Sequence, residues 1–411
     1  MIKAIMCRTL LFLVAIAGLA AGQQIVEFKD HVIESHMPGG YTVIVADVNH
    51  DGKPDVIGMT QQVKDLSWYE NPTWQPHVLV KDIPAMVNLA AYDIDGDGYP
   101  EVAIESGFSM TASKSEGLVW LLSHQGDPRL PWKATRIDAI TTSHHIAWAD
   151  IDGDGKKELI NAPLIGATNL APKYEGKTPL FFYRVPEDWS GKWNRVLIDN
   201  DLNGVLHRVR VVNWNGAGAR EQLLTAGFDG VILHSAGGKG DNLKWDHKLI
   251  VKGHDTEDAP RLGTSDVRLA HLGKRRFLAT VEPWHGNEVV VYTENATGGW
   301  QRHVIYDALT EGHEVCVGDF NGDGRDEIVA GDRAKGKVAS SHIFYSMDES
   351  GKEWHHEELD HMGMSASGCQ VADINGDGRP DIVMIGAATA NIKWYQNLGP
   401  AHPIVKTAAS H

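Results

Sequence analysis

The sequence predicts an all-β fold, a seven-bladed β-propeller made of four-stranded blades. Two repeats that run out of phase along the chain predict it. One is an acidic loop of the form D-x-[DN]-x-D-G-x-x-[DE], and the other is an aromatic residue that introduces a short strand. A third observation is a spare copy of the aromatic strand near the N-terminus, which indicates how the ring closes.

The acidic loops have the pattern of a calcium site. Carboxylates at positions 1, 3, 5 and 9 can converge on one hard cation, and the glycine at position 6 permits a sharp turn. The flanking segments, such as Tyr41–Ala46, are short and β-branched, so each loop joins two strands rather than two helices. About five Ca²⁺ sites are expected, with ligands Asp47, Asn49, Asp51, Asp55; Asp93, Asp95, Asp97, Glu101; Asp150, Asp152, Asp154, Glu158; Asp319, Asn321, Asp323, Glu327; and Asp373, Asn375, Asp377, Asp381.

Each repeat unit predicts four strands. The inner strand enters the acidic loop, the second leaves it, the third carries an aromatic pair such as Trp68-Tyr69, and the outer strand follows a tryptophan or phenylalanine. Those aromatic residues are Phe28, Trp74, Trp132, Trp193, Trp245, Trp300 and Trp354.

Two units without a complete acidic loop fit between Glu158 and Asp319. The first has Asn213 at position 1 and Ala217 at position 5, so we expect weak or no calcium binding there. The second, Val267–Leu278, has a short turn in place of the loop. The prediction is therefore seven blades, five of them with calcium.

The ends of the chain predict a closed ring and an exported protein. The last unit, Met364–Asn397, lacks an outer strand, and the spare strand Ile25–Glu34 is expected to complete it and so remove two exposed edges. Residues 1–22 combine basic residues, an apolar run too short to span a bilayer, and small residues for cleavage. We expect a signal peptide at 1–22, the propeller at 23–399, a tail at 400–411, and a secreted or periplasmic protein.

The charge and the apolar content of the chain argue against nucleic acid as a partner and against a membrane-spanning segment. The net charge of −16 argues against nucleic acid as a partner, and no segment after the leader is apolar enough to cross a membrane.

The three cysteines are not expected to form a disulfide. Cys7 lies in the leader. Cys316 lies three residues before Asp319 and Cys369 four before Asp373, so equivalent strands would present them on opposite faces. That placement favours two buried thiols over a disulfide.

The face opposite the acidic loops is expected to carry the functional site. Six residues before each loop, at the start of the inner strand, stand Tyr41, Val87, His144, His207, His313 and Ser367, with Thr264 roughly equivalent in the loopless blade. Histidine recurs at three of these positions. Imidazoles with a nearby carboxylate can bind a transition metal or act as acid and base.

The candidate site residues are drawn from this face. The expected catalytic residues are His144, His145, His207, Glu282, His285, His313 and Arg333; the expected substrate-binding residues are Tyr41, Glu105, Arg208, His254 and Trp284. The arginines can hold a carboxylate or sugar hydroxyls, and the tryptophan can stack on a sugar ring.

The repeats resemble the FG-GAP/VCBS repeats of integrin α-chain propellers and of many secreted bacterial proteins, from Ile25 to about Gly399. Four further stretches resemble the propeller part of aldos-2-ulose dehydratase-like lyases, which remove water from keto sugars such as 1,5-anhydrofructose: Gly204–Arg208, Leu223–Gly230, Thr280–Gly286 and Gly312–Arg333. This resemblance implies a carbon–oxygen lyase that acts on a carbohydrate.

The chemistry of such a lyase suggests roles for the residues. Elimination of water beside a ketone needs a base, an electrophile and an acid. As a hypothesis, His207, His285 and His313 hold Zn²⁺ or another divalent transition metal with Glu282 nearby, and His144 or His145 is the base. The alternatives are a uronate polysaccharide lyase and a non-catalytic propeller that binds glycans or proteins.

Overall fold

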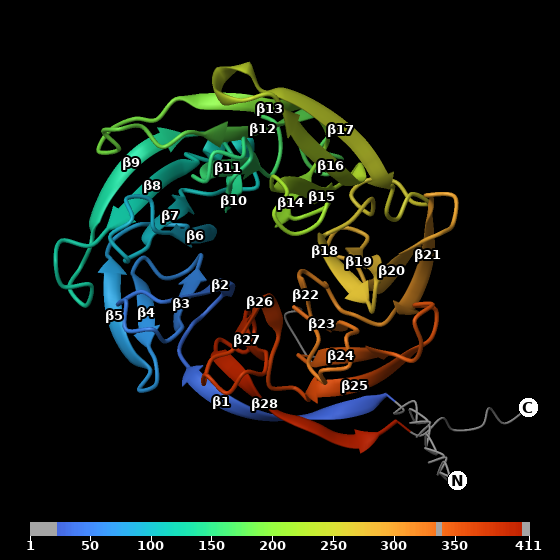
Figure 1. The fold of residues 1–411 in the computed structure, drawn as a ribbon. Helices are drawn as coiled ribbons and strands as arrows, with labels where there is room; N and C mark the ends of the chain where they lie inside the picture. Colours follow the sequence, from blue (N-terminus) through green and yellow to red (C-terminus); the bar gives the residue numbers. More distant parts are fainter. Residues whose placement is uncertain (1–22, 334–338, 405–411) are drawn as a thin grey trace, which may run out of the picture.

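A computed structural model describes residues 23–333 and 339–404. Seven antiparallel sheets of four strands surround a central axis, as Figure 1 shows, which confirms the predicted seven-bladed β-propeller. The expected signal peptide, residues 1–22, lies outside the described residues. Within the described part of the chain, no helix has the length and apolar character needed to cross a membrane.

The blades follow one another along the chain, each from its inner to its outer strand. Blades 1 to 3 are β2 (Gly40–Ala46), β3 (Asp55–Thr60), β4 (Leu66–Glu70), β5 (Gln75–Val80); β6 (Asn88–Tyr92), β7 (Glu101–Ser106), β8 (Leu118–Ser123), β9 (Lys133–Ala139); and β10 (Ser143–Ala149), β11 (Glu158–Pro163), β12 (Lys177–Tyr183), β13 (Arg195–Asn203). Blades 4 and 5 are β14 (Leu206–Val212), β15 (Gln222–Gly227), β16 (Gly230–Gly237), β17 (Lys244–Val251); and β18 (Asp266–Leu272), β19 (Arg275–Glu282), β20 (Glu288–Glu294), β21 (Trp300–Tyr306). Blade 6 is β22 (Val315–Gly318), β23 (Glu327–Gly331), β24 (Ser341–Ser346), β25 (Trp354–Asp360), and blade 7 is β26 (Ala366–Ala372), β27 (Asp381–Gly386), β28 (Ile392–Pro403), β1 (Gln24–Glu34). Two short 3₁₀ turns are η1 (Ala112–Lys114) and η2 (Gly240–Asn242).

Each acidic loop is organised by its own carboxylates. In the first loop, Gly52 at position 6 has φ of 82°, a left-handed conformation that glycine adopts at little cost. Its N–H donates to the position-1 carboxylate of Asp47 over 2.9 Å. The position-9 carboxylate of Asp55 accepts the N–H of Val48 over 3.0 Å. The other four loops repeat both bonds, so the backbone holds the acidic side chains on the inside of a tight turn.

An asparagine directly after β4 and an asparagine within β28 join neighbouring blades. The N–H of Asn71 and of Asn397 donates to the position-9 carboxylate of its own loop. Their side-chain amides donate to backbone carbonyls of the preceding blade, Ile374 over 2.7 Å and Phe320 over 2.8 Å. The acidic loops therefore also fix how successive blades pack.

The ring closes as predicted. β1 pairs antiparallel with β28, and the blue and red strands lie side by side in Figure 1. The expected boundary of the tail at Pro400 is wrong, because β28 continues to Pro403 and the N–H of Ile404 donates to the carbonyl of Gln23. The end of the chain beyond 404 lies outside the described residues.

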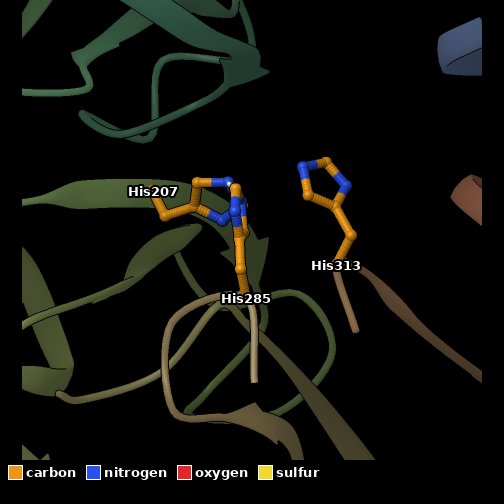
Figure 2. Close-up of side chains that lie close together, drawn as sticks. All are labelled: His207, His285 and His313. Carbon is orange, nitrogen blue, oxygen red and sulfur yellow. Dashed lines mark hydrogen bonds between the residues drawn. The ribbon is translucent and has the colours of Figure 1, made fainter. Parts of the chain in front are cut away.

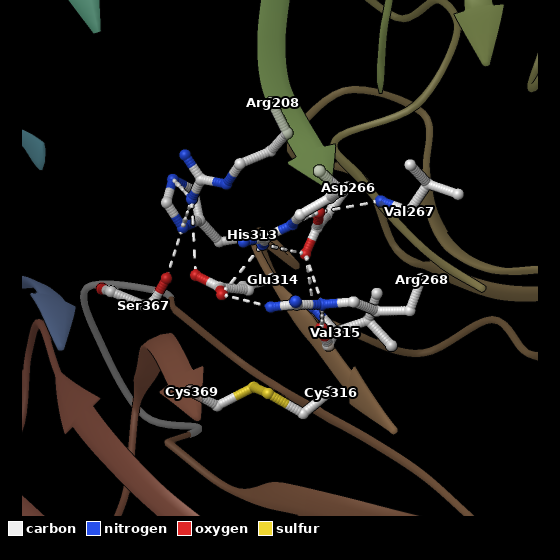
Figure 3. The surroundings of a disulfide bond; sticks show 11 residues. Arg208, Asp266, Val267, Arg268, His313, Glu314, Val315, Cys316, Ser367 and Cys369 are labelled. Atoms are coloured by element: carbon white, nitrogen blue, oxygen red, sulfur yellow. Dashed lines mark hydrogen bonds and ion pairs between the residues drawn. A yellow bond between two sulfur atoms is a disulfide. The ribbon is translucent and has the colours of Figure 1, made fainter. Parts of the chain in front are cut away.

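The structure contradicts the preference for free thiols. Cys316 of β22 and Cys369 of β26 form a disulfide with their Cα atoms 6.2 Å apart, shown in Figure 3. The two cysteines do lie on opposite faces of equivalent strands. Successive blades, however, pack the front of one sheet against the back of the next, so opposite faces are the ones that meet.

Blade 4 keeps the shape of an acidic loop but lacks the carboxylates at positions 1, 3 and 5. Gly216 and Gly218 are left-handed, with φ of 98° and 79°. The guanidinium of Arg276 lies 4.3 Å from the ring centroid of Trp214 and donates to the Trp214 carbonyl over 3.2 Å. A protein cation thus supports this loop from the neighbouring blade. In blade 5, Leu272 and Arg275 bound the short turn that the sequence predicted.

Candidate functional site

The candidate residues gather where the inner strands begin. Tyr41, His144 and His207 lie at the starts of β2, β10 and β14, and His313 lies two residues before β22. Acidic loops follow the opposite ends of β2, β10 and β22, and the Asn213 loop follows that of β14. The histidine-rich region and the acidic loops therefore occupy opposite ends of the ring, and binding at one end leaves the other accessible.

Three imidazoles from successive blades converge near the axis. The ring centroids of His207, His285 and His313 are 4.9 to 5.1 Å apart, and one nitrogen of each lies within 4.8 Å of the others. The Nε2 atoms of His207 and His285 are 3.2 Å apart. Figure 2 shows the three rings around a common space. Three nitrogens at this spacing can hold a borderline divalent metal.

Backbone carbonyls of the next blade set the tautomers of two of these rings. Nδ1 of His207 lies 2.6 Å from the carbonyl oxygen of Ser265, and Nδ1 of His313 lies 2.5 Å from that of Ser367. A carbonyl can only accept, so each Nδ1 carries the hydrogen and each Nε2 presents a lone pair. Ser265, rather than Thr264, is therefore the residue of blade 5 equivalent to Ser367.

His285 reaches the cluster from a strained turn. Its φ is 51°, an uncommon conformation for a residue with a side chain. Its N–H donates to the hydroxyl of Ser265 over 2.5 Å, and the N–H of Gly286 donates to the carbonyl of Pro283 over 2.8 Å. These bonds hold a backbone that directs the imidazole back over the axis.

Tyr41 connects the cluster to a fourth imidazole. Its hydroxyl lies 2.9 Å from Nε2 of His144 and 3.3 Å from Nε2 of His313. The His144 ring lies 5.2 Å from the ring of His207. The guanidinium of Arg333 lies 5.3 Å from the centre of the Tyr41 ring. The structure thus groups a phenol, a cation and four imidazoles from blades 1, 3, 4, 5 and 6.

All four imidazoles are held neutral. Burial lowers the pKa of His144, His207, His285 and His313 well below the usual value for histidine. The guanidinium of Arg208 lowers these pKa values further, because a second positive charge beside a cation is unfavourable. Neutral imidazole is the form that binds a metal or accepts a proton.

Arg208 lies buried between the imidazole cluster and a carboxylate. It is 1% exposed, and one of its terminal nitrogens lies 3.1 Å from Nδ1 of His313 and 3.6 Å from a carboxylate oxygen of Glu314. Glu314 also accepts bonds from Arg210 and Arg268. Figure 3 shows this network above the disulfide. Arg208 therefore contacts the cluster through His313, and its expected substrate-binding role stays a prediction.

Aromatic side chains line one side of the cluster. Trp284 lies 4.6 Å from the ring of His285 and 5.7 Å from Phe228, and Phe108 lies 5.2 Å from His144. Tyr174 meets Trp284 edge to face at 5.8 Å. The sequence predicted only Trp284, because the other three come from connecting segments that follow no repeat.

Glu282 and His254 lie outside the cluster, contrary to expectation. The Glu282 carboxylate accepts bonds from Arg302, over 2.8 Å, and from Tyr292, also over 2.8 Å, both in outer strands of blade 5. Arg302 also binds Glu288, which in turn lies 3.4 Å from Nδ1 of His254. Glu282 is the last residue of β19 and its side chain faces the outer strands of its sheet, whereas the strained turn after it redirects His285.

His145 and Glu105 also lie apart from the imidazoles. Successive strand residues point to opposite sides, so His145 faces an axial cavity of about 370 Å³ lined also by Arg210 and Arg268. Glu105 is buried, and one carboxylate oxygen accepts a bond from the Ser143 hydroxyl over 2.5 Å. Burial raises the pKa of Glu105 well above its usual value.

The acidic loops have the donor set of a hard cation site. Oxygens of Asp93, Asp95 and Glu101 lie within 4.8 Å of one another, as do those of Asp150, Asp152 and Glu158. Burial and neighbouring carboxylates raise the pKa of Glu101 and of Glu158 to about 7. Carboxylates crowded in this way fit a divalent ion that would neutralise them.

Comparisons with known proteins agree with this architecture. Residues 116–295 match the family model "Aldos-2-ulose dehydratase, beta-propeller domain", residues 47–104 match "FG-GAP-like repeat", and residues 312–339 match "FG-GAP repeat". The aldos-2-ulose dehydratase of Phanerodontia chrysosporium is 24% identical over 345 residues, which cover 74% of this chain and 37% of that protein. The chain thus spans little more than a third of the length of this curated relative.

Solved structures show the same fold at low identity. BBS1N in complex with ARL6DN has a TM-score of 0.55 at 11% identity, covering 94% of this chain and 100% of that one. The exotype rhamnogalacturonan lyase YesX has a TM-score of 0.50 at 13% identity, covering 93% and 75%. The molecule is an FG-GAP-type β-propeller by fold. Its resemblance to the propeller domain of aldos-2-ulose dehydratase, first indicated by the sequence, is confirmed.

Proposed function

We propose that this protein is a carbohydrate lyase that eliminates water from a keto sugar or a related sugar derivative at the imidazole cluster. The similarity to aldos-2-ulose dehydratase supports a propeller of the sugar-dehydratase type. The observation that carries the proposal is the convergence of His207, His285 and His313 from three successive blades. A scaffold alone does not require three neutral imidazoles, two of them fully buried, around one space.

The residues present fit a metal of the zinc type. Backbone carbonyls fix the hydrogens of His207 and His313 on Nδ1, which leaves their Nε2 atoms as ligands. A divalent transition ion held by these histidines would supply a Lewis acid for the ketone oxygen of the substrate.

The proton transfers fall to residues beside the three ligands. We assign His144 as the base that removes the proton next to the ketone, because burial keeps its imidazole neutral. The carbon–oxygen bond of the neighbouring hydroxyl then breaks. Tyr41, hydrogen-bonded to His144, protonates the departing hydroxyl as water and regains its proton from the imidazole. His145 faces the axial cavity instead.

Charged and aromatic groups around the cluster would bind the sugar. Arg333 lies over Tyr41 and supplies positive charge where negative charge develops on the substrate oxygen. Trp284 lies beside His285 and offers an aromatic face to a sugar ring. In the same proposal the five acidic loops bind Ca²⁺ as structural ions, in an exported protein where calcium is plentiful.

The test is a histidine series on the full chain. His207→Ala and His313→Ala should abolish turnover of a keto sugar such as 1,5-anhydrofructose, measured as the appearance of the unsaturated product. His254→Ala is the matched control, because this histidine binds Glu288 away from the cluster. The calcium-dependent melting temperature should be nearly the same in all three variants. Full activity in both cluster variants would refute the assignment, and turnover of uronate polymers alone would favour a polysaccharide lyase.

A further inference from the structure

A second group of metal-ligating side chains lies far from the axis, between blades 3 and 4. It consists of Asp199 in β13, His234 in β16 and His247 in β17. Figure 1 shows these strands next to one another on the outer part of the ring. The Nδ1 atoms of the histidines are 2.8 Å apart, and Oδ2 of Asp199 lies 3.7 Å from Nδ1 of His234 and 3.5 Å from Nδ1 of His247.

The tautomer of His234 favours a ligand role. Its ring is 0% exposed, and its Nε2 lies 2.9 Å from the hydroxyl oxygen of Thr225. That hydroxyl itself points to the carbonyl of Ile232, 3.5 Å away. Since the hydroxyl donates to the carbonyl, it accepts from Nε2, and Nδ1 is left with a lone pair. Such a hydrogen bond behind the ring is typical of a metal-binding histidine.

Irregular pairing of β12 with β13 directs the carboxylate of Asp199 toward His234 and His247. The register of β12 with β13 shifts on both sides of the Leu180–Asp199 pair. Such bulges redirect side chains. One carboxylate oxygen of Asp199 accepts the N–H of Asp201 over 2.8 Å, while the other faces both imidazoles. An anion from blade 3 therefore meets two nitrogens from blade 4.

The facing ring nitrogens of this group also fit a cation. The Nδ1 atoms of His234 and His247 are 2.8 Å apart, and two imidazoles that approach through the same type of nitrogen can share only one hydrogen. A metal ion would accept both lone pairs and the carboxylate oxygen together.

We propose that Asp199, His234 and His247 bind one Zn²⁺ ion that fastens blade 3 to blade 4. Two imidazole nitrogens and one carboxylate oxygen suit zinc, whereas calcium prefers oxygen ligands alone. The His247 side chain is 33% exposed while Asp199 is 8% exposed, so the fourth position opens to solvent and takes water. The site is separate from the axial cluster and does not depend on the proposed enzymatic function.

The first experiment locates the ion. The full-length protein is stripped with a chelator, refilled with ZnCl₂, crystallised, and examined by anomalous scattering at the zinc edge. We expect a peak between Asp199, His234 and His247, distinct in position from any peak on the axis. Absence of this peak in zinc-loaded crystals would overturn the proposal.

The second experiment compares matched variants in solution. His247→Ala should lose one equivalent of bound zinc by mass spectrometry, and the rise in melting temperature caused by zinc should shrink. His356→Ala is the control: like His247, this histidine stands two residues after the tryptophan of an outer strand, here in blade 6, and it contacts His342 through Nε2. Asp199→Asn keeps the size of the side chain and should also weaken zinc binding. Equal zinc content in His247→Ala and the wild type would refute the site.

Discussion

At the scale of single residues, the arrangement of the axial cluster depends partly on backbone atoms. Carbonyls of Ser265 and Ser367 place the hydrogens of His207 and His313, so the chemistry of one blade is set by the backbone of the next. Substitution of either serine should leave these bonds intact as long as the strands keep their places. The Ser265 hydroxyl has a separate role, because it accepts the N–H of His285.

The hydroxyl of Tyr41 can be removed without removing the aromatic ring that carries it. Tyr41→Phe keeps the ring and its contact with Arg333 but removes the group that lies between His144 and His313. We expect kcat to fall by about 100-fold with little change in KM, because a proton donor acts in the transition state. Steady-state kinetics on a keto sugar measure this, and an unchanged kcat would exclude Tyr41 from proton transfer.

The buried carboxyl of Glu105 is expected to make the stability of the protein depend on pH. Burial raises its pKa, so the folded state holds a proton on this carboxyl over a pH range in which the unfolded state has released it. Its contribution to stability is therefore present below the unfolded pKa and declines as pH rises above it. Glu105→Gln, which mimics the protonated form, should be more stable than the wild type at pH 8, with a smaller difference at pH 4. Urea denaturation in saturating calcium tests this, and equal stability at pH 8 would contradict it.

At the scale of elements, the connection between the two inner strands differs from blade to blade. In blade 5 it is a short turn. In five blades it is a loop that gathers carboxylates, which we propose bind a cation. The loop of blade 4 has the same left-handed glycines but is supported by Arg276. Calcium dependence should therefore differ between blades.

The calcium count follows from this difference. We expect five bound calcium ions per chain by equilibrium dialysis, and Asp154→Asn, at position 5 of the third loop, should remove one. Chelation should lower the melting temperature, since a ligand bound only to the folded state stabilises it. Six ions in the wild type would show that the Asn213 loop binds calcium after all.

The Arg276→Ala variant tests how the loop of blade 4 is supported. Loss of the contact with Trp214 should cost about 1 kcal/mol of unfolding free energy, in line with a partly exposed cation–π pair. The loss should be the same with calcium and with chelator, because the arginine stands in place of the ion. A loss that disappears in chelator would indicate that this loop takes an ion.

At the scale of the whole molecule, two devices secure the last blade. β1 supplies its outer strand, and the Cys316–Cys369 disulfide joins its inner strand to blade 6. The bonded cysteines are 53 residues apart in sequence, so the cross-link restricts a long loop of the unfolded chain.

Removal of this bond should be costly. The Cys316→Ala/Cys369→Ala variant should lose about 4 kcal/mol of unfolding free energy by the loop-entropy model. Guanidinium denaturation with and without reductant measures it. The wild type should become similar to the variant when reduced, while the variant itself should not respond to reductant.

Much of the architecture was predictable because it repeats. Blade number, strand order and the closing role of Ile25–Glu34 all follow from periodic residues, and the positions of His144, His207 and His313 from the same register. The predictions that are wrong concern features that depend on tertiary contacts between sheets. The outward direction of Glu282 and the pairing of Cys316 with Cys369 depend on which sheet faces which. Single-blade periodicity does not contain that information.

The aromatic side of the site could not be predicted for a related reason. Phe108, Tyr174 and Phe228 come from segments that differ in length from blade to blade, so no repeat marks them. His145 is next to His144 in sequence, but the alternation of strand residues directs the two side chains to opposite sides. Proximity in sequence is a poor guide to a site built from the beginnings of several strands.

The pairing of β1 with β28 also constrains how the protein is assembled. Residues 24–34 are synthesised before every other strand of the propeller, whereas their partner, residues 392–403, is synthesised after the others. Every preceding blade can form from neighbouring segments, whereas this contact has the longest sequence separation and is expected to form slowly. Until residues 392–403 have been synthesised, β1 has no strand of its own sheet to join. Cellular factors that shield unpaired strands would therefore act on this protein while the propeller is being synthesised.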